Sequence, residues 1–319
     1  MLEVRNLKTY FFTRHGVVKA VDGINFRVGD GENLGLVGES GCGKSVTALS
    51  ILRLVPSPPG RILEGEILLD GEDILKKSEA MMRKIRGVKI SIILQDPLTS
   101  LNPAYTIGDQ IGEAVEIHQH LRGKLVFRKV VEVLKLVRVP EPEVRAGDYP
   151  HQMSGGMRQR VAGAIALSCQ PRLLIADEPT TSLDVTIQAQ YLDLLKQIQE
   201  QSGISIVFVT HDFGIVARMC DHVAVMYAGK IVEFSRVKEI FDNPCHPYTT
   251  ALLKCLPRLD IASKLVTIEG DVPDLSTLPP GCSFAPRCAN RKPICDEKYP
   301  EEVMINKNHR VNCWLWSPQ

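Results

Sequence analysis

The stretch GESGCGKS at residues 38–45 constrains this chain most, because it matches the pattern G-x-x-x-x-G-K-[ST]. The apolar run LGLV precedes it, and VTALSILRLV, with helical apolar spacing, follows it. A strand, a glycine-rich loop and a helix in this order form a phosphate-binding loop. Glycines let successive backbone N–H groups point at phosphate oxygens, and the positive end of the helix favours an anion. For this motif alone, the alternative is a glycine-rich turn that matches by chance.

The residue types within this loop predict individual contacts. Lys44 is expected to reach the β- and γ-phosphates of a nucleotide, and the Ser45 hydroxyl to bind Mg²⁺. Cys42 lies at a helix N-terminus, a position that can lower the pKa of a thiol, but an inert cysteine is favoured over oxidative control of ATP binding. The residues of this stretch expected to contact ATP are Gly38, Glu39, Ser40, Gly41, Cys42, Gly43, Lys44, Ser45 and Val46.

The length, net charge and hydropathy of the chain exclude several classes of protein. The 319 residues suggest about two domains. With 38 Lys+Arg against 37 Asp+Glu, the chain lacks the positive charge of an electrostatic nucleic-acid binder. We find no apolar run of about 18 residues and no signal peptide, so we expect a chain that neither spans a membrane nor is exported. Any contact with a membrane would then come through a partner.

Residues 1–34 are expected to form strands of an antiparallel sheet. LEVRNLKTYFF and VVKAVDGINFRV have alternating stretches, with a turn at His15 and Gly16. Tyr10, Phe11 and Phe12 lie where such a sheet offers a ring to a base, although aromatic residues in strands more often belong to the core. Phe11 or Tyr10 is the expected partner of adenine. EGEILLDGEDI, with a tight turn at Asp70-Gly71, extends the same sheet.

A second group of candidates follows apolar strands. Ile90 to Leu94 reads as a buried strand ending at Gln95, which is expected to accept from Mg²⁺-bound water and to hold an attacking water; a surface glutamine is the alternative. RLLIADEPT ends in Asp177, a carboxylate well placed for Mg²⁺. Glu178 points to the other side of the strand and is available to orient or deprotonate water. ISIVFVTHD ends at His211, a candidate donor to a γ-phosphate or a structural histidine.

Residues 153–160, MSGGMRQR, supply a second phosphate-contacting turn at a helix N-terminus. Ser154, Gly155 and Gly156 are small residues suited to that contact. The turn lies more than a hundred residues beyond the first loop, and one γ-phosphate hardly needs two such loops from the same chain. It is therefore expected to serve the nucleotide of another subunit, while an ordinary helix cap is the alternative. Residues 98–170 otherwise look mostly helical.

The order of six motifs resembles that of an ATP-binding-cassette (ABC) ATPase. They are GESGCGKS, the glutamine after IIL, MSGGMRQR, LLIADEPT, TSLD and VTHD, and they cover residues 1 to about 240. The signature turn reads MSGGM where many cassettes have LSGGQ, but its serine and both glycines are present. The resemblance implies an α/β fold, an ABC-type P-loop NTPase with a RecA-like core, an antiparallel β subdomain and an α-helical subdomain at about residues 98–170. It also implies that Asp184 contacts ATP.

The residues after 240 resemble one group within this family. EIFDNPCHPYTTALLKCLPRLD is similar to the stretch N-P-x-H-P-Y-T-x-x-L-L of dipeptide and oligopeptide importer ATPases, and GCSFAPRCANRKPICDEKYP to their C-terminal extension. The resemblance implies an ATPase domain at 1–240, an extension at 241–319, and an ATP-hydrolysing subunit that powers peptide uptake. Importers of nickel or another small solute share these features. A soluble, non-transport ABC ATPase is less favoured, because the chain is neutral and has one nucleotide site.

Four of the nine cysteines crowd into the last forty residues, which in an intracellular chain favours metal over disulfides. Structural Zn²⁺ sites more often use pairs of cysteines two to four residues apart. The wider spacing here, C-x5-C-x6-C-x17-C, fits a [4Fe–4S] cluster at least as well as it fits a Zn²⁺ site. A metal centre would stabilise a short segment that is too small for a core of its own. The resemblance favours the cluster, with Zn²⁺ as the first alternative and free thiols or disulfides as the second. The expected ligands are Cys282, Cys288, Cys295 and Cys313.

The resemblance also implies partners and roles. A second ABC ATPase subunit, a paralogue or a second copy, would close head to tail on this one, with two permease subunits and, indirectly, an extracytoplasmic peptide-binding protein. The chain would be peripheral, at the cytoplasmic face of the cell membrane, with no nucleic acid bound. The residues expected to act in hydrolysis are Lys44, Gln95, Glu178 and His211, with Mg²⁺ held by Ser45, Gln95 and Asp177.

Overall fold

The computed structural model describes residues 1–96, 100–181, 183–256 and 267–317. Its contacts divide the chain into two compact units. Unit 1 comprises Met1–Val28, Asn33–Leu75 and Val209–Gln319, and unit 2 comprises Gly29–Glu32 and Lys76–Phe208. Strand β8 (Ser205–Thr210) runs from unit 2 into unit 1. Among the described residues, no helix combines the length and the apolar character needed to cross a bilayer.

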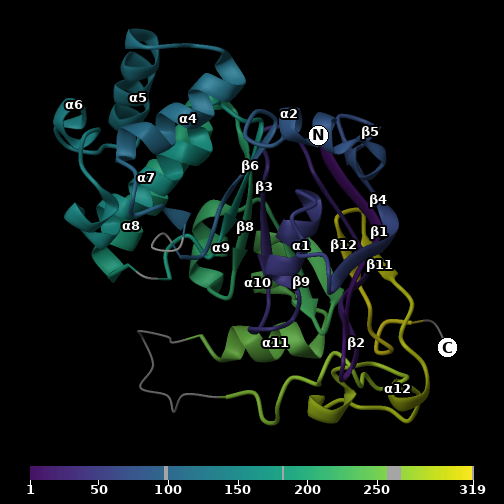
Figure 1. Ribbon diagram of the computed structural model, residues 1–319. Helices are drawn as coiled ribbons and strands as arrows, with labels where there is room; N and C mark the ends of the chain where they lie inside the picture. Colours follow the sequence, from purple (N-terminus) through teal and green to yellow (C-terminus); the bar gives the residue numbers. More distant parts are fainter. Residues whose placement is uncertain (97–99, 182, 257–266, 318–319) are drawn as a thin grey trace. The chain divides into compact units, whose positions relative to one another are not determined.

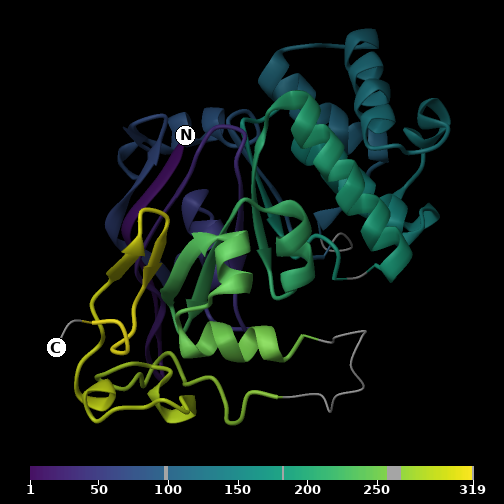
Figure 2. The ribbon, with the colours of Figure 1, turned by 180° about the vertical axis from the view of Figure 1, so that it is seen from behind.

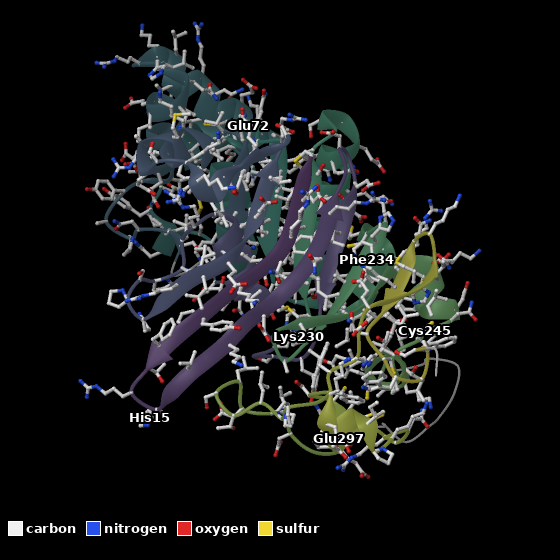
Figure 3. The ribbon with its side chains drawn as sticks, turned by 90° about the vertical axis from the view of Figure 1, so that its right-hand side faces the viewer. His15, Glu72, Lys230, Phe234, Cys245 and Glu297 are labelled. Atoms are coloured by element: carbon white, nitrogen blue, oxygen red, sulfur yellow. The ribbon has the colours of Figure 1, made fainter. Side chains whose placement is uncertain are left out.

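An antiparallel sheet at the N-terminus of unit 1 has the strand order β2-β1-β4-β5. The expected strands are confirmed, with β1 paired to β2 through Thr13 and Gly16 at the end of a hairpin whose tip carries His15 (Figure 3). Asp70 and Gly71 have positive φ angles, as a tight turn between twisted strands requires. The strands are β1 (Leu2–Thr13), β2 (Gly16–Val28), β4 (Gly60–Leu69) and β5 (Glu72–Asp73).

The second set of strands in unit 1 follows the order β11-β12-β10-β9-β3. β3 (Asn33–Val37) is buried throughout and runs parallel to β9 (His222–Tyr227), and continuous apolar runs are typical of parallel strands covered on both faces. β10 (Lys230–Arg236) is antiparallel to β9. The C-terminal hairpin of β11 (Val303–Asn306) and β12 (His309–Val311) adds to β10. This hairpin, yellow in Figure 2, is bound to the N-terminal sheet because Arg310 Nη2 donates to Asn25 O at 2.7 Å.

The helices of unit 1 are short, and their buried faces meet a cluster of aromatic and branched side chains. Tyr227 and Tyr248 are in edge contact at 4.6 Å between ring centroids, and Phe284 lies 5.3 Å from each. Phe284 belongs to residues 282–313, which carry the four C-terminal cysteines and are called the cysteine-rich segment below. This segment therefore contributes to the core of unit 1. The helices are α1 (Lys44–Ile51), α9 (Phe213–Met219), α10 (Val237–Asp242), α11 (Pro247–Lys254), α12 (Ile294–Glu297) and the 3₁₀ turn η3 (Ala285–Arg287).

Unit 2 contains a helical region and a parallel pair of strands (Figure 1). β6 (Ile90–Ile93) pairs with β7 (Leu173–Asp177), both as the apolar runs predict. A capping box of Thr106 and Asp109 starts α4, and α5 buries one face at helical spacing. Its helices are α2 (Glu79–Ile85), α4 (Ile107–Gln119), α5 (Lys124–Leu136), α6 (Pro142–Arg145), α7 (Gly155–Leu167) and α8 (Val185–Ser202); the 3₁₀ turns are η1 (Ile74–Lys76), which begins in unit 1, and η2 (Pro150–Gln152).

Candidate functional site: a phosphate loop and a glutamine–glutamate pair

The loop between β3 and α1 has the predicted strand–loop–helix context. Lys44 begins α1 and is 5% exposed. Its Nζ donates to the carbonyl oxygens of Gly38 at 2.8 Å and Glu39 at 2.9 Å. The ammonium group therefore lies inside the ring of the loop, where the backbone amides and the helix N-terminus also place positive charge.

Three glycines give this loop the shape of an anion cradle. A Cβ on Gly38 would lie 2.1 Å from Met226 O, and one on Gly43 would lie 2.0 Å from Ala20 O, so neither position accepts a larger residue. A Cβ on Gly41 would meet nothing within 4 Å, and its φ of +79° is left-handed. The loop is thus packed tightly at Gly38 and Gly43 and is open at Gly41, where a phosphate group can approach the backbone.

The interpretation of Cys42 as an inert cysteine is confirmed. The side chain is completely buried, and its burial raises the pKa of the thiol in spite of the nearby Lys44 ammonium. Desolvation disfavours the thiolate more than the helix N-terminus and Lys44 favour it. A buried, protonated thiol is a poor target for oxidants, so the structure gives no support for oxidative control at this position.

Gln95 and Glu178 meet in unit 2, from the ends of the paired strands β6 and β7. Gln95 Nε2 donates to Glu178 Oε2 at 2.9 Å. The same oxygen accepts from Thr181 Oγ1 at 2.9 Å, a contact that the sequence did not indicate. Asp177, the last residue of β7, is 4% exposed, whereas Glu178 is half-buried with a left-handed φ of +44°. Glu178 therefore lies in a turn just beyond the end of β7, and the expected alternation of the two carboxylates along the strand stays a prediction.

The turn at residues 154–156 is a helix cap whose polar atoms are accessible. Ser154 Oγ accepts from Met157 N at 3.3 Å at the start of α7, and both Ser154 and Gly155 are exposed. A Cβ on Gly156 would lie 2.9 Å from Ile187 Cγ2, so α8 restricts that position to glycine. Ser154 therefore acts as an ordinary helix cap, as the alternative interpretation predicted, and both Ser154 and Gly155 lie at the surface.

The remaining predicted contacts lie on separate elements. Phe11 is half-buried in β1, and Tyr10 donates from its hydroxyl to Asp22 Oδ1 at 2.7 Å. Asp184 is the N-cap of α8 and accepts from Ile187 N at 2.9 Å. His211 follows β8 and is exposed. The predicted TSLD motif includes residue 182, which lies outside the described residues.

The four C-terminal cysteines line one apolar pocket in unit 1, together with His246 and Phe284. All nine cysteines of the chain are free thiols. Cys282 N donates to Cys295 O at 2.7 Å, which folds the segment back on itself. Burial, and to a smaller extent the neighbouring thiols of Cys295, Cys313 and Cys288, raise the pKa of Cys282 to about 11. Four thiols that are close enough to influence one another are a suitable ligand set for a cationic metal group.

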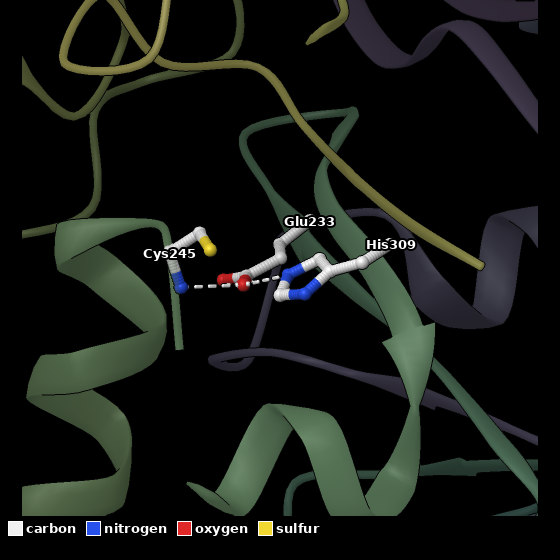
Figure 4. Close-up of side chains that lie close together, drawn as sticks. All are labelled: Glu233, Cys245 and His309. Atoms are coloured by element: carbon white, nitrogen blue, oxygen red, sulfur yellow. Dashed lines mark hydrogen bonds and ion pairs between the residues drawn. The ribbon is translucent and has the colours of Figure 1, made fainter. Parts of the chain in front are cut away.

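A second group in unit 1 combines a carboxylate, a ring nitrogen and a sulfur within 4.8 Å, from Glu233, His309 and Cys245 (Figure 4). Glu233 Oε1 is 2.7 Å from His309 Nε2 and accepts from Cys245 N at 2.6 Å, while Oε2 accepts from His246 N at 2.9 Å. Both carboxylate oxygens are thus occupied by protein partners. This hydrogen-bond network binds β10, β12 and the start of α11 together.

Two residues that contact the phosphate loop could not be predicted from the sequence. Tyr248 Oη accepts from Glu39 N at 2.9 Å, and Arg287 pairs with the carboxylate of Glu39. Tyr248 belongs to the resembling stretch HPYT, but only its place in that stretch distinguishes it from a core tyrosine. Arg287 lies 248 positions from Glu39, a distance over which a single sequence carries no pairing information.

The chain has the features of an ATPase of the cassette class. They are a phosphate loop after a buried strand, a small-residue turn at a helix cap, and a glutamine–glutamate pair at neighbouring strand ends. The family described as ABC transporter matches residues 21–181, and the chain belongs to that family. Its members' nucleotide is ATP, bound with Mg²⁺. A second family, described as the C-terminal region of oligopeptide/dipeptide transporters, matches residues 232–295.

Relatives are similar over nearly the whole chain. The dipeptide transport ATP-binding protein DppD of Bacillus subtilis is 50% identical over 316 residues, which cover 99% of this chain and 94% of the relative. The oligopeptide transport ATP-binding protein OppD of the same organism is 48% identical, covering 100% of this chain and 89% of the relative. A solved dimeric post-hydrolysis state of the ATP-binding cassette MJ0796, bound to ADP and Pi, is 26% identical, with a TM-score of 0.67 over 74% of this chain and 99% of the other.

Proposed function

We propose that this chain is the ATP-hydrolysing subunit that powers uptake of dipeptides or oligopeptides through a membrane importer. The observation that carries the peptide class is the match of residues 232–295 to the oligopeptide/dipeptide transporter C-terminal region, on a chain whose phosphate loop is intact. The names of DppD and OppD support the same class. The domain proposal is an ATPase domain at 1–240, with its helical part at about 98–170, and an extension at 241–319.

The proposed chemistry assigns roles to the residues of both units. Lys44 stabilises charge on the γ-phosphate, Glu178 orients and activates the attacking water, and His211 donates to the γ-phosphate. The contact of Gln95 with Glu178 supports this role, because it holds the carboxylate in one orientation. Ser45, Asp177 and Gln95 would hold Mg²⁺, which neutralises charge on the phosphates. The remaining proposed ATP contacts are Phe11, residues 38–46 and Asp184.

A pair of cassettes is proposed to close head to tail. Residues 154–156 of one subunit would then contact the nucleotide held at residues 38–45 of the other. The exposure of Ser154 and Gly155 supports this arrangement, since a cap used only within its own chain has no need of an open surface. The second subunit is a paralogue or a second copy. This pair of ATPase subunits binds two transmembrane permease subunits at the cytoplasmic face of the membrane. An extracytoplasmic peptide-binding protein delivers the peptide.

The extension is proposed to hold a [4Fe–4S] cluster on Cys282, Cys288, Cys295 and Cys313. Four thiolates around one Zn²⁺ ion would lie about 3.8 Å apart, given Zn–S bonds of about 2.3 Å in a tetrahedron. Among the described residues, which include all four cysteines, no three of these sulfurs lie within 4.8 Å of one another. That spread favours a larger group than a single ion. The cluster would supply structural stability to the segment.

The peptide class is tested by deleting the gene in the organism that carries it. We expect uptake of labelled dipeptides or oligopeptides to be lost, and to return with the wild-type gene but not with the Glu178→Gln variant, while nickel uptake is unchanged. Loss of nickel uptake with unaltered peptide uptake would overturn the peptide assignment and favour the alternative importer class. Unaltered uptake of both would overturn the peptide assignment and favour an importer of another small solute.

A further inference from the structure

The cysteine-rich segment reaches the phosphate loop through one arginine. Arg287 directly precedes Cys288, and its Nη1 and Nη2 donate to the two carboxylate oxygens of Glu39 at 2.7 and 3.0 Å. The side chains of Arg287 and Glu39 are 5% and 28% exposed. A two-point contact between guanidinium and carboxylate fixes the orientation of the partner as well as its charge. The second residue of the loop is therefore held by the extension.

Arg287 is itself firmly placed. Its Nε donates to Glu269 O at 3.0 Å, and its Nη1 donates to Tyr227 Oη at 3.4 Å. Its guanidinium carbon lies 5.9 Å from the centre of the Tyr227 ring. The arginine is thus fixed to the core and to the extension before it reaches Glu39, so little conformational freedom is lost in making the contact.

The backbone of Glu39 is restrained by two more contacts. Its N–H donates to Tyr248 Oη at 2.9 Å, and its carbonyl oxygen accepts from Lys44 Nζ at 2.9 Å. Tyr248 is completely buried, and its ring packs 5.3 Å from that of Phe284, which stands between Cys282 and Cys288 in the sequence. The fold of the cysteine-rich segment therefore restrains the positions of both the carboxylate and the backbone N–H of Glu39.

We propose that Arg287 is a positioning residue for the phosphate loop, so that the affinity for ATP depends on the fold of the cysteine-rich segment. Without Arg287, the carboxylate of Glu39 becomes an unpaired negative charge in a loop that binds an anionic ligand, and that charge repels the phosphates. The loop also loses a restraint that holds it ready for ATP. The inference rests on the proposed ATP contacts of residues 38–46 and does not depend on which metal the cysteines hold.

A double-mutant cycle tests the contact directly on the full chain. The variants are Arg287→Met, Glu39→Gln and the two combined, and the measurements are the Kd of Mg·ATP by calorimetry and the KM and kcat of hydrolysis. We expect Arg287→Met to raise Kd and KM about tenfold, within the range of coupled sites, with kcat nearly unchanged. Adding Glu39→Gln should recover most of that affinity, because the unpaired charge is then gone.

Arg291→Met is the matched control. Arg291 makes an equivalent two-point contact with Asp296 in the same segment, but at the surface, with side chains 52% and 43% exposed. It should leave the Kd of ATP unchanged. If Arg287→Met does not fold, Arg287→Lys replaces it: the charge stays but the fork is lost, and Kd should still rise severalfold.

Two results would overturn the inference. In one, the arginine variant binds ATP as tightly as the wild type. In the other, the combined variant recovers no affinity, which would assign Arg287 a structural role alone. A wild-type chain that binds no ATP would instead contradict the proposed ATP site, so the two failures are distinguishable.

Discussion

Gly43 is the residue on which the shape of the phosphate loop depends most. Its φ is +106°, and a Cβ there would lie 2.0 Å from Ala20 O and 2.7 Å from Met226 Cε. The left-handed backbone alone costs a larger residue about 1–3 kcal/mol, and the collision adds to that. We therefore expect Gly43→Ala to abolish measurable ATP binding in equilibrium titration and to lower the Tm.

Gly123→Ala provides the control for this variant. Gly123 also has a positive φ, +57°, but a Cβ there would meet nothing within 4 Å. It should lower the Tm by the backbone cost alone and leave ATP binding intact. Equal ATP affinity in the Gly43 and Gly123 variants would show that the close packing around Gly43 does not shape the site.

Single residues were predictable where the motif fixed both residue type and spacing. Gln95 and Glu178 were each placed at the end of a strand from an apolar run, and the structure joins them by a hydrogen bond. The raised pKa of Cys42 could not be predicted, because the sequence indicates the helix N-terminus but not the burial that outweighs it. Arg287 was missed because its partner lies 248 positions away in the chain. Local chemistry is readable in a sequence, whereas desolvation and long-range pairing arise only on folding.

At the scale of elements, the first part of the cysteine-rich segment, residues 282–297, has little regular structure beyond the turn η3 and the short helix α12. It buries Phe284 in the core of unit 1 and directs four thiols into one pocket. A metal group on those thiols would replace the packing that so short a segment lacks.

The composition of that group is a proposal, and metal analysis tests it. Protein purified without oxygen should contain about four irons and four sulfides per chain, with a broad brown absorption band, if the ligands are four thiolates. The Cys282→Ser variant should lose the iron, while Cys169→Ser, which changes a cysteine of unit 2 outside the pocket, should keep it. Stoichiometric zinc in the wild type would contradict the cluster and replace it by a structural zinc site.

Elements whose pattern is local were predicted well. β1, β2 and β4 follow from alternation and turn residues, and β6, β7 and β8 from short apolar runs. The hairpin of β11 and β12 was not expected, since the tail was read as loops. Its three- and four-residue strands form because β12 pairs with β10, and their own sequence is too short to specify them.

At the scale of the whole molecule, the candidate residues are divided between the two units. Unit 1 carries the phosphate loop and His211, and unit 2 carries Gln95, Asp177, Glu178 and the turn at 154–156. The proposed reaction therefore needs both units, and it needs a second subunit for each nucleotide. The sequence predicted the order of the motifs along the chain, whereas their division between the two units and the contact of Arg287 with the phosphate loop emerged only from the fold.

The most direct measurement is single-turnover ATP hydrolysis by the Glu178→Gln variant, purified with its partners from native membranes. Since the amide cannot accept a proton from the attacking water, hydrolysis should fall by about 10²–10⁴-fold while the Kd of ATP stays near that of the wild type. Glu143→Gln, which alters an exposed glutamate of unit 2 paired with Lys135, should hydrolyse ATP normally. Hydrolysis by the Glu178 variant at nearly the wild-type rate would contradict the account.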